Sequence, residues 1–117
     1  MKAQVLTLAD LPIDRPMPRI ERQRVIAERM MISKVRLLPG FVLETHQHDN
    51  EQIVVMVKGR CRFTLGAVGS PDFREVDVKG GQVLVLPGGT PHSCVVIEET
   101  EILDLFSPIS EKTGVDR

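Results

Sequence analysis

The chain has 117 residues, a length typical of one domain. It carries 15 Lys and Arg against 16 Asp and Glu, a formal net charge of −1. This balance, with neither Trp nor Tyr, argues against a nucleic-acid partner. Residues 1–10 resemble no signal peptide, and the longest apolar run, residues 53–57, is too short for a bilayer, so we expect a cytoplasmic protein without a membrane partner.

The first part of the chain predicts an irregular arm. Pro12, Pro16 and Pro18 favour extended backbone. Residues 20–30 have some helical character, although they carry many charges and little periodic apolar face. We therefore assign an N-terminal arm to residues 1–30 and predict a helical segment at its end.

From residue 31 onward the chain consists of short β-type runs separated by turn residues such as Pro39-Gly40 and Asp49-Asn50. Strands are predicted at residues 31–38, 42–48, 52–57, 60–65, 73–78, 83–86, 92–97 and 101–106. Many short strands at regular spacing are typical of a sandwich or a barrel. We expect an all-β domain over residues 31–108 and a loose tail at 109–117.

The predicted strand at residues 52–57 is apolar on both faces. Side chains alternate along a strand, so Ile53, Val55 and Val57 share one face, while Val54 and Met56 lie on the other. One face can fill the core, whereas the second needs cover from another sheet or another subunit. We expect a homodimer.

The three histidines of the chain, His46, His48 and His92, are the main candidates for chemistry. A spacing of two on a strand places His46 and His48 on one face, where both can bind the same ion. The alternative is that both are exposed strand residues without a ligand. Neutral imidazole is a ligand for Zn, Fe, Ni and Cu, and it can also bind Mn.

Two spaced motifs contain these histidines. The first reads G-x5-H-x-H-x3-Q-x6-G over residues 40–59, and the second reads G-x5-P-x-G-x2-H over residues 81–92. Together they resemble the paired motifs of the cupin superfamily, over about residues 30–108. The resemblance implies an antiparallel double-stranded β-helix, the RmlC-like jelly-roll barrel. It also implies one divalent transition metal ion (Ni, Zn, Fe, Mn or Cu) held by His46, His48, Gln52 and His92.

Two positions depart from the family motifs. Gln52 stands where the family has Glu, and Val96 stands where it has Asn. Glu51 is adjacent to Gln52 but out of phase, and a shift of one residue reverses the face of a strand, so we expect Glu51 to point outward. A neutral Gln ligand would leave the ion its full charge and make it a stronger Lewis acid.

Gln52 and the run D-L-F-S-P at residues 104–108 also make the chain resemble the small cupins of pectin degradation, which ketonise unsaturated uronates. The resemblance implies a catalytic Asp104 and a pocket wall at Phe106. Asp104 is a candidate general acid or base if its face of the last strand points inward, and an outer residue if the Leu103 face does. Those enzymes carry an Arg where this chain has Ser110.

Lys34 or Arg36 could replace the missing Arg as a substrate contact; the alternative is that both lie on a solvated face. Met56 is a further expected substrate contact. The implied function is metal-assisted proton transfer or isomerisation on a small oxygenated substrate, without a redox partner. The alternatives are a metal-dependent dioxygenase, a non-catalytic small-molecule-binding cupin and a purely structural metal site.

Cys61 and Cys94 form no C-x-x-C motif, and we expect two buried thiols rather than a disulfide.

Overall fold

The computed structural model describes residues 2–109, and its regular structure is almost entirely β. Besides a short 3-10 helix, η1 (Leu8–Asp10), the elements are β1 (Ile20–Ile26), β2 (Met31–Leu37), β3 (Val42–His46), β4 (Glu51–Leu65), β5 (Arg74–Lys79), β6 (Val83–Leu86) and β7 (His92–Ser107). Every pairing between these strands is antiparallel. The predicted all-β class is therefore confirmed. None of the described helical segments has the length and apolar character needed to cross a membrane.

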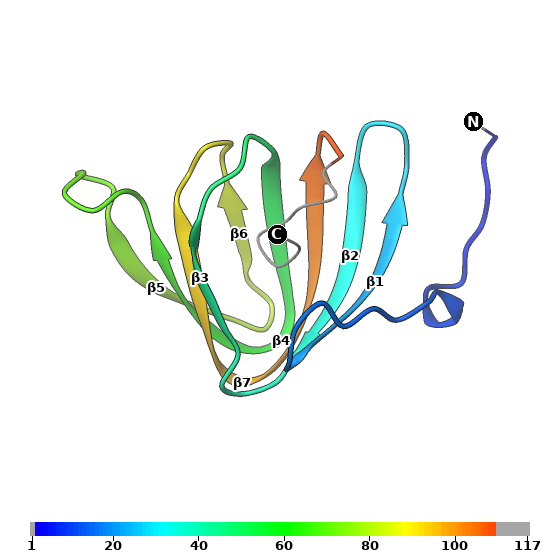
Figure 1. Cartoon of the computed structure of the whole chain (residues 1–117), viewed down its shortest axis with the longest axis horizontal. Helices are drawn as coiled ribbons and strands as arrows, with labels where there is room; N and C mark the ends of the chain where they lie inside the picture. Colours follow the sequence, from blue (N-terminus) through cyan, green and yellow to red (C-terminus); the bar gives the residue numbers. More distant parts are fainter. Residues whose placement is uncertain (1, 110–117) are drawn as a thin grey trace.

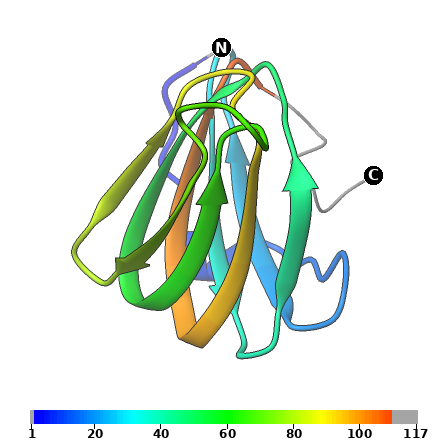
Figure 2. The same cartoon turned by 90° about the vertical axis from the view of Figure 1, so that its left-hand side faces the viewer.

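The two long strands β4 and β7 organise the barrel. They run side by side and bend together, so that each belongs to two leaves of the sheet. One leaf has the order β1-β2-β7-β4-β6, and the other has the order β3-β7-β4-β5. Figure 1 shows both leaves diverging from the bends of β4 and β7 at the bottom of the view, and Figure 2 shows the same arrangement from the side.

Each long strand takes the place of two shorter strands that the sequence predicted. The bend of β4 lies at Gly59, which has a φ of 97°. A Cβ at Gly59 would lie 2.4 Å from the carbonyl oxygen of Glu99 and 2.4 Å from Oγ1 of Thr100. The buried Thr100 hydroxyl accepts a hydrogen bond from the Arg60 amide (3.2 Å) and donates one to the Glu98 carbonyl (2.8 Å). Gly59 therefore bends the strand without interrupting it.

Residues 20–26 form strand β1, so the predicted helix over residues 20–30 is wrong. β1 pairs with β2 along its whole length, from Ile20 opposite Leu37 onward. Its charges have cross-strand partners, as where Glu21 pairs with Arg36 at 3.2 Å. Sheet pairing thus overrides a weak local preference for helix. The sheet begins at residue 20 rather than 31, and the irregular arm is limited to the residues before it.

The core lies between the inner faces of the two leaves. Its members are mostly aliphatic and include Val35, Leu37, Val54, Met56, Phe63, Leu86, Val96 and Ile102. Cys61 and Cys94 are buried within it and unbridged, which confirms the prediction of two thiols. The predicted tail lies largely outside the described residues.

Candidate metal centre

Three histidine rings meet in the space between the leaves. His46 is the last residue of β3, His92 is the first residue of β7 and its cross-strand partner, and His48 lies just beyond β3. One ring nitrogen from each lies within 4.8 Å of the others. The ring centroids of His46 and His92 are 4.2 Å apart, and those of His48 and His92 are 5.2 Å apart. The structure therefore brings together the three histidines that the sequence singled out.

The loop between β6 and β7 brings His48 to this cluster. The Gly89 amide donates a hydrogen bond to the His48 carbonyl at 2.8 Å. Gly88 packs against the backbone of Asp49, because a Cβ at Gly88 would lie 2.5 Å from the Asp49 carbonyl oxygen. Gly88, at the variable position between Pro87 and Gly89 of the second motif, thus allows a close approach of two loops that a side chain would prevent.

Backbone carbonyls set the orientation of all three rings. Each ring places Nδ1 between 2.8 and 3.2 Å from the carbonyl oxygen of a residue two positions away. A carbonyl only accepts, so Nδ1 carries a proton, and in the neutral ring Nε2 then keeps its lone pair, as in metal-bound histidines. Burial lowers the pKa of His92 to about 4, despite its hydrogen bond to Thr90, so this imidazole is neutral at physiological pH.

Gln52 adds an oxygen donor. It is buried on the inward face of β4, whereas Glu51 is exposed, as the phase of the strand predicted. Its amide nitrogen donates to Oδ1 of Asp104 at 3.0 Å, so its Oε1 is the atom that lies 3.2 Å from Nε2 of His48. When the neutral His48 ring carries its proton on Nδ1, both of these atoms are acceptors, and a cation bound between them would make the contact favourable.

These four side chains, His46, His48, His92 and Gln52, are called the ligand cluster below. Their donors are three imidazole nitrogens and one amide oxygen, a set that suits a divalent transition metal such as Zn, Ni, Fe, Mn or Cu. The chemistry of the donors therefore fits the metal ion that the sequence implied.

Asp104 lies beside the ligand cluster. It shares the inward face of β7 with Ile102 and Phe106, which line the same cavity, so the inward alternative for this face is correct. Burial raises the pKa of Asp104 to about 6, although the hydrogen bond from Gln52 and the charge of Arg22 act in the opposite direction. The Phe106 ring meets the His48 ring edge-on, with centroids 5.8 Å apart. A carboxyl group with this pKa can both accept and donate a proton near neutral pH.

Three expected substrate contacts are placed elsewhere and need correction. Lys34 and Arg36 lie on the outer face of β2, where they pair with glutamates at 3.6 and 3.3 Å. Met56 is 1% exposed and belongs to the core, outside the residues that line the cavity. Strand alternation directs Ser33 into the cavity and places Lys34 and Arg36 on the opposite face of β2. Ser110 lies outside the described residues.

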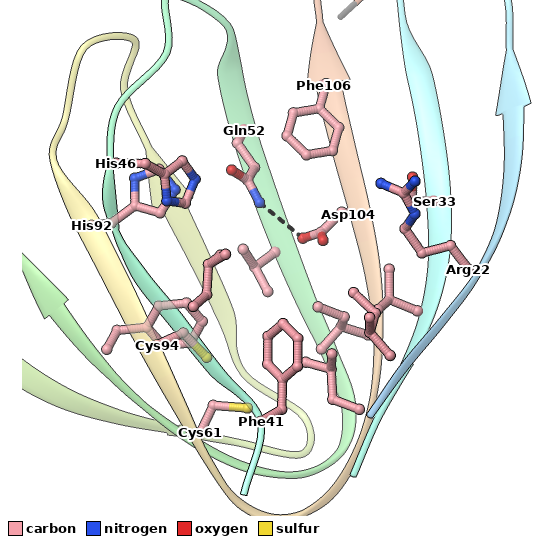
Figure 3. A pocket seen from close by; sticks show the side chains of 17 residues that line it. Arg22, Ser33, Phe41, His46, Gln52, Cys61, His92, Cys94, Asp104 and Phe106 are labelled. Atoms are coloured by element: carbon pink, nitrogen blue, oxygen red, sulfur yellow. Dashed lines mark hydrogen bonds between the residues drawn. The ribbon is translucent and has the colours of Figure 1, made fainter. Parts of the chain in front are cut away.

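Sequence reasoning missed Arg22, which is 4% exposed and lines the same cavity. Figure 3 shows Arg22 and Ser33 on one wall, His46 on the opposite wall, and Asp104 between them. The helix predicted for residues 20–30 concealed this placement. The available signal was strand alternation, which puts Ile20 and Arg22 on one face once the segment is read as a strand.

Comparison with known proteins identifies the fold. The family model described as "Cupin domain" matches residues 33–106. Oxalate decarboxylase OxdC from Bacillus subtilis (strain 168) is 33% identical over 86 residues, which cover 73% of this chain and 22% of that protein. This chain therefore spans about a fifth of the length of that relative.

Two solved structures are similar over nearly the whole chain. The structure of KdgF from Halomonas sp. matches with a TM-score of 0.82 and 24% identity, covering 94% of this chain and 97% of that chain. The structure of oxalate decarboxylase from Bacillus subtilis matches with a TM-score of 0.79 and 24% identity, covering 94% of this chain and 32% of that chain. Both likenesses concern the fold.

Proposed function

The chain belongs to the cupin family, and from that premise we propose that it is a metal-dependent isomerase of a small sugar-derived acid, with an unsaturated uronate ketonised to its linear form as the reaction. The ligand cluster is proposed to hold one divalent transition metal ion. The observation that carries the proposal is the half-buried Asp104 carboxyl, which is hydrogen-bonded to Gln52 beside three convergent imidazoles.

The ligand cluster is arranged to bind a cation and to leave its charge intact. Its histidines are oriented by backbone carbonyls, and Gln52 is oriented by Asp104. Three imidazoles and one amide bind a cation without adding negative charge to it. A divalent ion bound there would supply Lewis-acid polarisation of a substrate oxygen.

Asp104 is the group that moves the proton. An isomerisation removes a proton at one position of the substrate and returns one at another, so one residue that can do both can carry it out without a redox partner. The pKa of about 6 suits Asp104 to this task. Val54, Ile102 and Phe106 surround it with apolar walls that limit access of water.

The name of one relative supports a small acidic substrate. KdgF from Halomonas sp. is similar to this chain in fold, over 94% of this chain and 97% of that chain. Oxalate decarboxylase is named for its action on oxalate, a small carboxylic acid. The sequence resemblance to the cupins of pectin degradation adds the uronate itself.

The test is the substitution Asp104→Asn in protein loaded with a divalent metal. We expect the rate of loss of ultraviolet absorbance of an unsaturated galacturonate to fall by about 10²–10⁴-fold, the usual contribution of a general acid or base. Metal content, measured by elemental analysis, should stay unchanged. Asp77→Asn is the matched control, because Asp77 is an exposed partner of Arg62 on β5 and should leave the rate unaltered.

An Asp104→Asn variant with the parent rate would contradict the role of Asp104. A metal-loaded parent that leaves unsaturated uronates unchanged would contradict the reaction. Oxygen consumption in the same cuvette would point instead to the dioxygenase alternative.

A further inference from the structure

The cavity has a second polar end, opposite the ligand cluster. Among residues 2–109, Arg22 is the one Lys or Arg that lines this cavity, and its side chain is 3% exposed. Ser33, also buried, lies beside it on β2, and Ser33 is the cross-strand partner of Asp104. The polar groups thus run across the sheet from Arg22 through Ser33 and Asp104 to Gln52, as Figure 3 shows.

The guanidinium of Arg22 is held in one orientation by the N-terminal arm. Its Nε and Nη2 donate to the two carboxylate oxygens of Asp14 at 3.1 and 2.9 Å, and the backbones of these residues also pair. Such a two-point contact leaves a planar guanidinium little rotational freedom. Arg22 is therefore preorganised on its wall of the cavity.

Arg22 shares its carboxylate partner with a second guanidinium. Asp14 is bound at 2.9 Å by Arg24 as well as by Arg22, so that one carboxylate serves two guanidiniums. Asp14 and Arg24 do not line the cavity. Among the described residues that line the cavity, Arg22 is the one Lys or Arg and Asp104 the one carboxylate. A negative group on a ligand is therefore attracted to the Arg22 end.

We propose that Arg22, with Ser33, binds the carboxylate of the substrate and so selects acids over the corresponding neutral sugars. The β1 and β7 backbones are separated by β2 alone, on the order of 10 Å. A ring-sized acid held at Arg22 can therefore reach past Asp104 toward the ligand cluster. This inference rests on the proposed function in taking the ligand cluster as the other end of the binding site.

The experiment compares two unreactive probes, D-galacturonate and D-galactose, which differ in a carboxylate against a hydroxymethyl group. Binding to metal-loaded protein is measured by calorimetry. In the parent protein we expect galacturonate to bind at least about tenfold more tightly than galactose, which corresponds to about 1.4 kcal/mol. Arg22→Gln should reduce this ratio to near one, whereas Arg24→Gln, the matched control that shares Asp14, should keep the parent ratio.

Arg22→Lys keeps the charge and the aliphatic stem but loses the planar guanidinium that binds a carboxylate at two points. It replaces Arg22→Gln as the test variant if circular dichroism shows that Arg22→Gln is unfolded. We expect Arg22→Lys to discriminate less than the parent. A parent-like ratio in the folded Arg22 variants overturns the inference, as does a parent protein with equal or undetectable affinity for both sugars.

The uronate assay is read separately. If discrimination depends on Arg22 but the protein does not ketonise any uronate, the proposed reaction is wrong and the carboxylate site stands. If the protein ketonises a uronate but discrimination does not depend on Arg22, the carboxylate site is wrong and the proposed reaction stands.

Discussion

At the scale of single residues, the ligand cluster owes its geometry to backbone groups more than to other side chains. Each histidine Nδ1 faces a carbonyl two residues away, so the local strand or loop conformation sets the tautomer. Gln52 is the exception, because its amide is oriented by the side chain of Asp104. The metal ligand and the proton-transfer group are therefore coupled through one hydrogen bond.

This coupling makes Gln52 a sensitive position. Gln52→Leu keeps the approximate size of the side chain but removes both the oxygen donor and the hydrogen bond to Asp104. We expect its affinity for a divalent ion such as Ni²⁺ to fall by at least about tenfold in a titration, equivalent to about 1.4 kcal/mol. The comparison is Glu51→Gln on the outward face of the same strand, which should bind metal as the parent does. Equal affinities in all three proteins would show that Gln52 is no ligand.

At the scale of elements, the bends of β4 and β7 create the two leaves and hence the cavity. The Gly59 bend fits against Glu99 and Thr100 without space for a Cβ. The register of the β4–β7 ladder shifts in this region while pairing continues on both sides. The two leaves are consequently continuous through the bend, and the spacing of their inner faces depends on it.

Substitution of two glycines tests this dependence. Gly59 and Gly69 both have positive φ values, 97° and 86°, but a Cβ at Gly69 would meet nothing within 4 Å. Gly69→Ala should therefore show only the cost of the backbone conformation, about 1–2 kcal/mol. Gly59→Ala adds steric overlap, and we expect it to lower the free energy of unfolding by about 1–3 kcal/mol more in urea titrations. Equal losses in the two variants would mean that the bend tolerates a methyl group.

At the scale of the whole molecule, the outer face of one leaf is apolar. Ile53 lies between Val85 on β6 and Leu105 on β7, and Val55 lies between Val83 and Leu103 on the same strands. Val83 and Val85 are 56% and 57% exposed. These side chains form a contiguous apolar surface across three neighbouring strands, which is the second apolar face that the sequence showed for residues 52–57.

We propose that a second copy of the chain covers this face, because a two-fold homodimer requires only one self-complementary patch. Sedimentation of the parent protein should then give the mass of a dimer. Val85→Lys should shift it to the monomer, because a lysine at the centre of the interface is costly to bury. Val95→Lys is the control, since Val95 is 42% exposed on the other leaf. A monomeric parent protein at micromolar concentration would refute this arrangement.

The sequence by itself determined the all-β class and the outward phase of Glu51, whereas His48 lies beyond the end of β3 and is held by a loop contact. Both predictions follow from alternation along a strand, which is a local property and can be read without knowledge of neighbours. The resemblance of the two glycine-containing motifs to those of the cupin superfamily further implied that His92 joins the other histidines, although it lies far away in the sequence.

The tertiary structure decided what depends on pairing between distant segments. It made a strand of residues 20–26, because β2 offers them a full ladder of partners, and it thereby placed the buried Arg22 in the cavity. It also turned Lys34 and Arg36 outward, since the register of β2 against β7 directs Ser33 inward. The charged end of the cavity is therefore a product of strand registry, which a pattern within one segment does not contain.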